Sequence, residues 1–309
     1  MSTTPYYIGR LAPSPTGALH LGNVRTFMIA YLRARSQGGK LIMRMEDLDH
    51  PRDKPGAAAA AIEDLRWLSF DWDEEYTQSE RLPSYKAALD TLVAKGLAYP
   101  CICSRKDVEN AQSAPHSGEQ LFYPGTCRGK FASWEDAERA IAPRLPCWRF
   151  ATPHNDAKVT FNDAFAGTFS SNVASTLGDF PIARHPSGAG YTLAVVVDDA
   201  AMGVTEVVRG DDLLAATPAQ ILLFRALGLK IPQFCHVPLV IGKDGRRLAK
   251  RHGDTRISSF RASGVKPEEI IGYLAASCGW AKPGEKISLP HLIPRFDLST
   301  IPRAPLVWP

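Results

Sequence analysis

The chain has 309 residues, of which 45% are hydrophobic and 22% are charged, so it is long enough for two or three domains with a sizeable core. Its formal net charge of +4 allows a polyanionic partner without requiring one. No stretch reaches the roughly 20 apolar residues of a membrane span, and the N-terminal sequence lacks the features of a signal peptide. These properties exclude a membrane-spanning chain, and we expect a cytoplasmic protein that does not bind membranes.

The first part of the chain alternates between strand and helix patterns. Residues 6–11 and 40–47 predict two short strands. Residues 56–68 and 85–93 predict helices. A further helix is expected from about Gly22, because apolar residues recur at helical spacing: Val24, Phe27, Met28, Tyr31 and Leu32. This alternation is typical of a parallel α/β sheet.

The alternation breaks near Tyr99. From there to about Gly188 the sequence reads as short strands and loops, with a polar stretch at residues 109–120. The alternation returns at residues 191–199 and 203–210. We therefore expect one sheet domain that is interrupted by an insertion.

The last third of the chain begins with one more helix and strand. The helix is expected to have Thr217 as its N-cap and Pro218 at its first position, and residues 233–241 predict the strand. A second helix should start at Pro267, with an apolar face formed by Ile270, Ile271, Leu274 and Cys278. The tail from Ala281 holds six prolines and is expected to be mostly irregular.

These patterns divide the chain into four segments. Residues 1–98 and 190–245 form the two halves of a Rossmann-like catalytic domain, and residues 99–189 form the inserted subdomain. Residues 246–309 contain a basic loop, a short helical segment and the proline-rich tail.

Residues 10–23, RLAPSPTGALHLGN, connect the first strand to the first helix. Ligands bind at such strand ends in open α/β sheets, and the amides of a helix N-terminus favour a phosphate. Gly17 and Gly22 allow close approach of a ligand to the backbone, and His20 can donate to a phosphate oxygen. The alternative is a proline-stiffened turn with a surface histidine. The common phosphate-binding and hydrolase motifs are absent from the sequence.

A basic loop at residues 242–254 follows the last predicted strand of the sheet. It contains Lys243, Arg246, Arg247, Lys250 and Arg251 among glycines. Such a loop can fold over the same crevice and stabilise the charge of leaving pyrophosphate. The alternative is a solvated basic loop without a ligand.

These motifs together resemble a known family. HLGN at 20–23 looks like the HIGH signature of class I aminoacyl-tRNA synthetases, and RLAKR at 247–251 looks like their KMSKS loop, with Ala249 in place of the usual serine. RMEDLD, YTLAVVVDDAAMGVTEVVRGDDLL and HVPLV resemble the catalytic core of glutamyl-tRNA synthetases, from about Gly9 to about Trp280. The resemblance implies the class I fold, with a Rossmann-like parallel sheet.

The resemblance also implies a set of site residues. It assigns the glutamate pocket to six residues: Arg10, Ala12, Ser14, Glu46, Tyr191 and Arg209. Glu46 would hold the α-amino group of the substrate, and Arg209 would face a carboxylate. His20, Gly22, Asn23 and Lys250 would bind ATP with Mg²⁺, and His20 and Lys250 would assist catalysis.

Each assignment has a structural alternative. Glu46 can instead pair with Arg44 or Lys40. Arg209 can form an ion pair with Asp198 or Asp211. Tyr191 can be a half-buried aromatic residue on a strand.

Six cysteines without a secretory signal indicate a metal site or buried thiols. Cys101, Cys103 and Cys127 need a fourth ligand for tetrahedral zinc. The resemblance implies Tyr123 as that ligand, whereas His116 is chemically the more usual one. The alternative is three buried cysteines without a metal. The other three are expected to be core residues: Cys147, Cys235 and Cys278.

The length beyond the basic loop narrows the resemblance. Only 59 residues follow Lys250, whereas ordinary glutamyl-tRNA synthetases continue into a long helical anticodon-binding region. The pattern resembles the glutamyl-queuosine tRNA(Asp) synthetases, which activate L-glutamate with ATP and pass it to queuosine at the wobble position of tRNA(Asp). We expect this activity in a monomer.

Three alternatives stay open. The nearest is a compact synthetase that charges the 3′ end of tRNA(Glu). The others are an inactive zinc-bearing RNA-binding module and an adenylylating enzyme that acts on a different acid.

Overall fold

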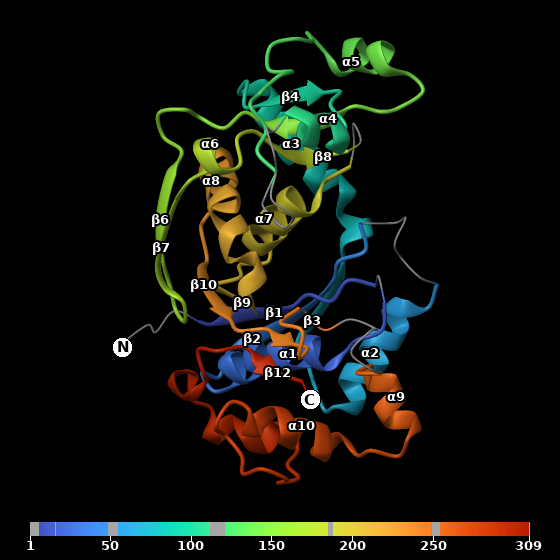
Figure 1. Cartoon of the computed structure of the whole chain (residues 1–309), viewed down its shortest axis with the longest axis vertical. Coiled ribbons are helices and arrows are strands. Elements are labelled where there is room, and N and C mark those ends of the chain that lie inside the picture. The colour runs from blue at the N-terminus through green and yellow to red at the C-terminus, as the bar shows by residue number, and fades with distance from the viewer. Residues whose placement is uncertain are drawn as a thin grey trace.

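The computed structural model describes residues 6–15, 17–48, 55–111, 121–184, 188–246, 248 and 254–308. A twisted sheet lies across the middle of the molecule, with helices above and below it (Figure 1). Apolar side chains on the two faces of the sheet form separate cores, one with α1, α2 and α10 and one with α3, α7 and α8. The sheet is therefore covered on both sides, as a parallel sheet requires.

The sheet is built from two groups of strands. The first has the order β1 (Ile8–Leu11), β2 (Lys40–Met45) and β3 (Glu74–Thr77), all parallel. The second has the order β7 (Gly167–Asn172), β6 (Lys158–Asp163), β10 (Gln233–Val237) and β9 (Glu206–Gly210). The groups meet at β1 and β9, where the amide of Thr205 donates to the carbonyl of Ile8 at 2.9 Å.

The direction of strand order changes at this junction. From β1 the chain continues to β2 on one side, and it returns much later to β9 on the other side. In open α/β sheets such a switch point leaves a crevice at the carboxyl ends of the strands. The prediction of a parallel α/β sheet is confirmed.

Helix α1 (Leu21–Arg35) follows β1 and packs on the sheet. The predicted apolar positions Val24, Met28, Tyr31 and Leu32 are buried. Helices α2 (Ala57–Trp67) and α3 (Leu82–Ala94) also form where expected, with a short 3-10 turn, η2 (Gln78–Arg81), before α3. Helical periodicity was sufficient here because each helix buries one continuous face.

The second half of the catalytic domain, predicted at residues 190–245, departs from the sequence prediction at two points. Residues 191–201 form a helix, α7 (Tyr191–Ala201), so the strand placement of Tyr191 is wrong. Three successive valines favour a strand locally, but Val195 to Val197 are all buried in the helical layer, and that packing decides.

The second departure is at the next helix, α8 (Thr217–Leu227). A 3-10 helix, η3 (Asp211–Ala216), runs directly into it, so Ala216 takes the N-cap position and Thr217 is already helical. The prediction of Thr217 as N-cap is wrong, because its hydroxyl bonds to Leu213 and Arg209 instead. The predicted strand at 233–241 is interrupted at Pro238, and the chain continues as β11 (Val240–Ile241).

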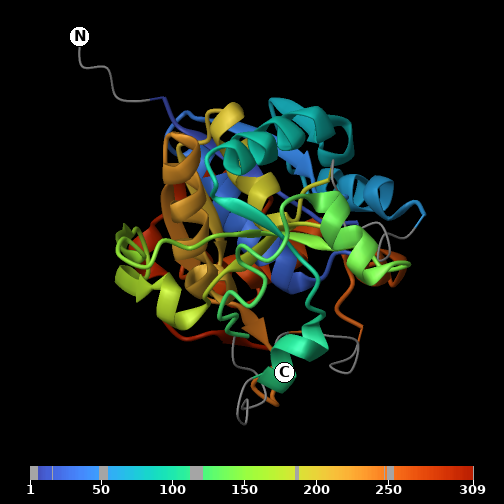
Figure 2. The same ribbon diagram turned by 90° about the horizontal axis from the view of Figure 1, so that it is seen from above.

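The segment from Tyr99 onward contributes a small separate sheet. Strands β4 (Ala98–Cys101), β5 (Cys147–Phe150) and β8 (Phe180–Ala183) are antiparallel and carry the short helices α4 (Arg105–Ala111), α5 (Trp134–Ile141) and α6 (Val173–Thr176). In the view from above, the teal and green parts of this segment lie over the blue strands (Figure 2). Strands β6 and β7 come from the same stretch of sequence but extend the main sheet beside β10.

The remaining residues pack beneath the sheet. Helices α9 (Ile257–Ala262) and α10 (Pro267–Ala276) are followed by two 3-10 helices, η5 (Leu289–Arg295) and η6 (Leu298–Thr300). Strand β12 (Leu306–Val307) then pairs in parallel with β11. The tail is mostly irregular, as expected, but it is packed on the core through residues such as Leu289 and Leu292.

Candidate active site and cysteine cluster

A cavity of about 590 Å³ lies at the switch point of the sheet. It is bounded by the carboxyl ends of β1, β2 and β9, by the N-termini of α1 and α7, and by β11. Eight of the predicted site residues line it: Ala12, Ser14, His20, Gly22, Asn23, Glu46, Tyr191 and Arg209. The fold therefore brings together side chains from four separate parts of the sequence.

His20 is the N-cap of α1. Its ring Nδ1 accepts a hydrogen bond from the amide of Gly22 at 3.1 Å, and Asn23 Oδ1 accepts from the amide of His20 at 3.2 Å. A side chain at Gly22 would crowd the imidazole, because a Cβ there would lie 3.0 Å from the ring. The N-terminal end of α1 thus meets the cavity with its positive helix dipole and without an acidic residue in the first turn.

Arg44, Glu46 and Asp199 form a buried ion-pair network beside the cavity. Arg44 Nη2 lies 3.0 Å from Glu46, and Arg44 Nη1 lies 2.6 Å from Asp199. The alternative pairing of Glu46 with Arg44 is therefore confirmed, while Lys40 pairs with Glu74. Burial raises the pKa of Glu46, and Arg44 opposes that shift. Glu46 still faces the cavity, so the pairing fixes its position without hiding it.

Arg10 lies behind the cavity wall rather than in it. Its Nη1 donates to the carbonyl of Val208 at 2.9 Å, and its Nε lies 3.6 Å from Asp199. The buried Nε has no hydrogen-bond partner in the described structure. Arg10 therefore contributes positive charge from behind the pocket.

The hydrogen bonds of Arg209 go to neutral groups, whereas those of the buried Arg44 go to Glu46 and Asp199. The Nε of Arg209 donates to His236, and its Nη2 donates to Thr217 at 2.8 Å and to Gln220 at 2.7 Å. The alternative ion pair with Asp198 is wrong, because Asp198 bonds to Gln78, Arg81 and Tyr85.

Burial lowers the pKa of Arg209, and the charge of Arg10 lowers it further. Arg209 is only 5% exposed, and its hydrogen-bond partners His236, Thr217 and Gln220 carry no negative charge. A buried cation of this kind is costly unless an anion pairs with it. The cavity is thus suited to a ligand carboxylate at Arg209.

Tyr191 is the first residue of α7 and is 44% exposed toward the cavity. The cavity is also lined by residues that lie within the family motifs but have no role predicted from the sequence: Asp212, Leu213, Leu239, Val240 and Leu248. Lys250 and Ala249 lie outside the described residues, so their place relative to the cavity stays a prediction.

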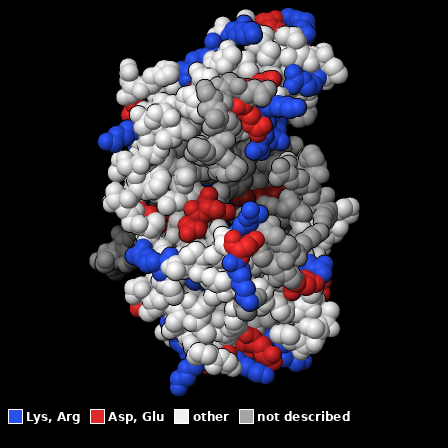
Figure 3. Space-filling view, in the orientation of Figure 1, with Lys and Arg blue, Asp and Glu red and all other residues white. Residues whose placement is uncertain are grey.

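The outer surface is not uniformly basic around this region. Asp and Glu side chains gather near the middle of the face in Figure 3, with Lys and Arg side chains around them. Among the described residues, the positive groups at or behind the cavity are the buried Arg10 and Arg209 and the N-terminus of α1.

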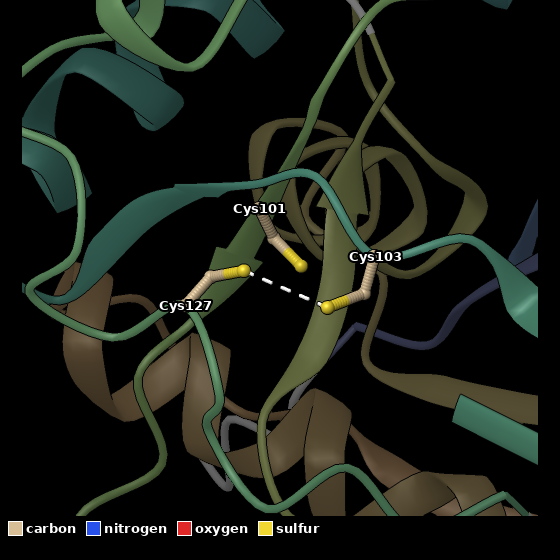
Figure 4. A group of neighbouring side chains, drawn as sticks. All are labelled: Cys101, Cys103 and Cys127. Atoms are coloured by element: carbon tan, nitrogen blue, oxygen red, sulfur yellow. Dashed lines mark hydrogen bonds between the residues drawn. The ribbon is translucent and has the colours of Figure 1, made fainter. Parts of the chain in front are cut away.

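A second candidate site lies in the small sheet. Cys101, Cys103 and Cys127 turn their thiols toward one another (Figure 4), and the sulfur atoms lie within 4.8 Å of each other. The hydroxyl of Tyr123 lies 3.2 Å from Cys101 Sγ and 3.5 Å from Cys103 Sγ. The predicted cluster is thus assembled from the end of β4 and the loop around Cys127, while His116 lies outside the described residues.

Cys147 is not the isolated core residue that the sequence suggested. It is half-buried and stands directly opposite Cys101 in the pairing of β4 with β5. Hydrogen bonding to Cys147 lowers the pKa of Cys101 to about 4, with Tyr123 and Arg149 adding to the shift. The sequence does not show which strands pair, so it could not reveal that Cys147 lies next to Cys101. Cys235 and Cys278 are buried in the core as expected.

None of the helices in the described part of the chain combines the length and apolar character needed to cross a bilayer.

Comparison with known proteins agrees with this geometry. Glutamyl-Q tRNA(Asp) synthetase of Symbiobacterium thermophilum is 48% identical over 312 residues, covering 97% of this chain and 95% of that protein. Glutamate–tRNA ligase of a Hydrogenobaculum species is 40% identical over 304 residues, covering 97% of this chain and 64% of that protein.

Among solved structures, a glutamate tRNA ligase from Elizabethkingia meningosepticum in complex with its amino acid superposes with a TM-score of 0.81. The two are 28% identical, and the match covers 98% of this chain and 67% of that chain. Residues 8–292 match the family described as tRNA synthetases class I (E and Q), catalytic domain. The chain therefore belongs to the class I tRNA synthetases for glutamate and glutamine.

Proposed function

We propose that this protein activates L-glutamate with ATP and transfers the glutamyl group to queuosine at the wobble position of tRNA(Asp). The observation that carries the first step is the buried Arg209, whose partners are neutral and which faces a cavity of suitable size. The second step is supported by relatives named glutamyl-Q tRNA(Asp) synthetase, which this chain matches over about 95% of their length.

The glutamate is held by groups of complementary charge. Arg209 binds one carboxylate, and the Glu46 carboxylate binds the α-ammonium group. Tyr191, Ser14 and Ala12 complete the pocket, and Arg10 adds positive charge from behind it.

The other carboxylate of glutamate attacks the α-phosphorus of ATP, and pyrophosphate leaves. His20, Gly22 and Asn23 present the N-terminus of α1 to the phosphates, and Lys250 is proposed to stabilise the leaving group. Mg²⁺ bound to ATP would reduce the charge of its phosphates. A hydroxyl of the queuosine cyclopentenediol then attacks the glutamyl carbonyl, an ester forms and AMP leaves.

We also propose that the cysteine cluster binds a structural zinc ion. Three mutually close thiols in a largely buried setting fit the sulfur ligands that tetrahedral zinc prefers. Tyr123 is the proposed fourth ligand, because its hydroxyl lies next to two of the sulfurs and accepts from the amide of Cys127 at 2.9 Å. The metal would then join β4 to the loop around Cys127 within the insertion.

A second candidate function is charging of tRNA(Glu) at its 3′ end. Relatives named glutamate–tRNA ligase are 40% identical to this chain, although the chain spans only 61–64% of their length.

Transfer of labelled glutamate to two tRNA pools separates these functions. One pool carries queuosine, and the other comes from cells that cannot make it. We expect label only in the queuosine pool. Equal labelling of both pools would instead establish a small tRNA(Glu)-charging enzyme.

A further inference from the structure

Four residues behind the cavity, three in direct contact with Arg209 and one acting through His236, have no role in the function proposed above. They are His236, Thr217, Gln220 and Asp163. All four are at least nine-tenths buried. In each of their hydrogen bonds, the donor and the acceptor can be assigned from the chemistry of the groups.

Arg209 Nε is 3.0 Å from His236 Nε2. A guanidinium nitrogen can only donate, so Nε2 of the imidazole must accept and must carry no proton. A neutral imidazole then has its proton on Nδ1. Asp163 Oδ2 lies 2.6 Å from that atom and accepts the proton's hydrogen bond.

Asp163 is itself fixed by the backbone. Its Oδ1 accepts from the amides of Phe165 at 3.0 Å and Ala166 at 2.8 Å, and from the amide of His236. Although burial alone would raise the pKa of Asp163, these bonds and the His236 ring hold it below its usual range. Burial lowers the pKa of His236. The charge of Arg209 lowers it further, and Asp163 opposes this shift.

We propose that Asp163 and His236 are a positioning pair that fixes the orientation of Arg209 and thereby selects a carboxylate substrate over its amide. Asp163 sets the ring tautomer, and the ring accepts from Arg209 without neutralising its charge. An acidic partner in the place of His236 would fix the guanidinium equally well but would cancel the charge that the substrate carboxylate needs. The proposal rests on the glutamate activation proposed above.

The selectivity for a carboxylate arises because the side chains that hold Arg209 are neutral. The bonds of Nε and Nη2 to His236, Thr217 and Gln220 hold the guanidinium in one orientation. Guanidinium nitrogens only donate, so they can bond to either oxygen of a carboxylate but not to the NH₂ group of an amide. A fixed cation binds a carboxylate more strongly than a neutral amide, because charge-assisted hydrogen bonds are about twice as strong as neutral ones.

The first test compares two amide variants of His236 in glutamate-dependent ATP–pyrophosphate exchange. In His236→Gln the side-chain oxygen replaces Nε2 and can accept from Arg209. In His236→Asn the polar atoms replace Nδ1 and can reach only Asp163. We expect the Asn variant to raise the KM for glutamate about tenfold or more, with the KM for ATP within about twofold, and the Gln variant to stay near wild type.

The Asn variant should also lose discrimination against glutamine, measured as the ratio of kcat/KM values for the two amino acids. A purely structural role would affect both variants alike. It would lower kcat without separating the KM for glutamate from the KM for ATP. Equal behaviour of the two variants would overturn the proposal.

The second test reads the tautomer directly from ¹⁵N NMR of the histidine rings, with His236→Gln identifying the signal. Wild type should show the neutral Nδ1–H form. Asp163→Asn keeps the oxygen that accepts from Phe165 and Ala166 and places an amide N–H opposite Nδ1, so the ring proton should move to Nε2. A charged ring or an Nε2–H form in wild type would contradict the pair.

The two tests separate the inference from the function on which it rests. If wild type shows no glutamate-dependent exchange, the proposed function fails and the selective role fails with it, whatever the NMR shows. If wild type exchanges but the His236 variants do not differ, only the positioning pair fails.

Discussion

Arg209 shows how a single buried residue can define a substrate class. Arg44 is neutralised by Glu46 and Asp199, whereas the hydrogen bonds of Arg209 go to His236, Thr217 and Gln220. The sequence could propose Arg209 as a ligand through family resemblance. Only its contacts show that its charge remains available.

Arg209→Ala should abolish glutamate activation, because removing one partner of a buried charge-assisted pair costs about 2–5 kcal/mol. The measurement is glutamate-dependent ATP–pyrophosphate exchange. Arg261→Ala is the control, since Arg261 pairs with Glu63 at the surface. Activity that survives in Arg209→Ala would show that the carboxylate binds elsewhere.

His236 also predicts how stability changes with pH. Its folded-state pKa lies below the ordinary value of 6.5, chiefly because the ring is buried. Above pH 6.5 the ring is neutral in both folded and unfolded chains, and its contribution is fully present. As the pH falls through this value, the unfolded chain takes up a proton that the folded chain resists, so stability is lost.

Urea unfolding at about pH 7.5 and about pH 5.5 measures this loss. The free energy of unfolding should fall less in His236→Gln than in wild type. Equal decreases in the two proteins would mean that His236 is not the group responsible.

At the scale of elements, the strand ends and helix starts determine the site. The capping of α1 by His20 follows from local sequence, and so does the turn before it. The position of helix α7 does not follow from local sequence. Residues 191–201 have strand propensity, but packing against α3 and α8 makes them helical. Tyr191 reaches the cavity only because this segment is helical and begins there.

The cysteine cluster joins β4 to the loop around Cys127, and its metal content is the prediction at this scale. Purified protein should hold about one zinc ion per chain, and Cys103→Ser should lose it. Cys235→Ala, in the sheet core, is the matched control. Metal analysis after dialysis measures the zinc content. A metal-free wild type would show that the cluster is three buried thiols without a metal.

At the scale of the whole molecule, the C-terminal tail pairs with β11, a strand that is distant from it in the sequence. The amides of Leu306 and Trp308 donate to the carbonyls of Leu239 and Ile241 at 3.0 and 2.8 Å. Trp308 also packs edge-on against Phe260 and Tyr273. Since Leu239 and Val240 line the cavity, the tail supports one wall of the site.

Two proline substitutions test this support. Leu306→Pro removes an amide that bonds to β11 and should lower the free energy of unfolding by about 1 kcal/mol or more. Val307→Pro is the matched control, because the bonds to β11 come from residues 306 and 308 and its side chain is exposed. Urea unfolding compares them, and equal loss in both variants would contradict a role for the pairing.

The sequence by itself predicted the parallel α/β sheet, the first three helices and, through the family motifs, the residues proposed for both candidate sites. Periodicity is a local property, and the family motifs are short enough to read directly. Tertiary structure decided the rest. It converted residues 191–201 into a helix, placed Cys147 opposite Cys101, paired the tail with β11 and left Arg209 with neutral partners. These outcomes depend on contacts between residues distant in the chain, and no local pattern carries that information.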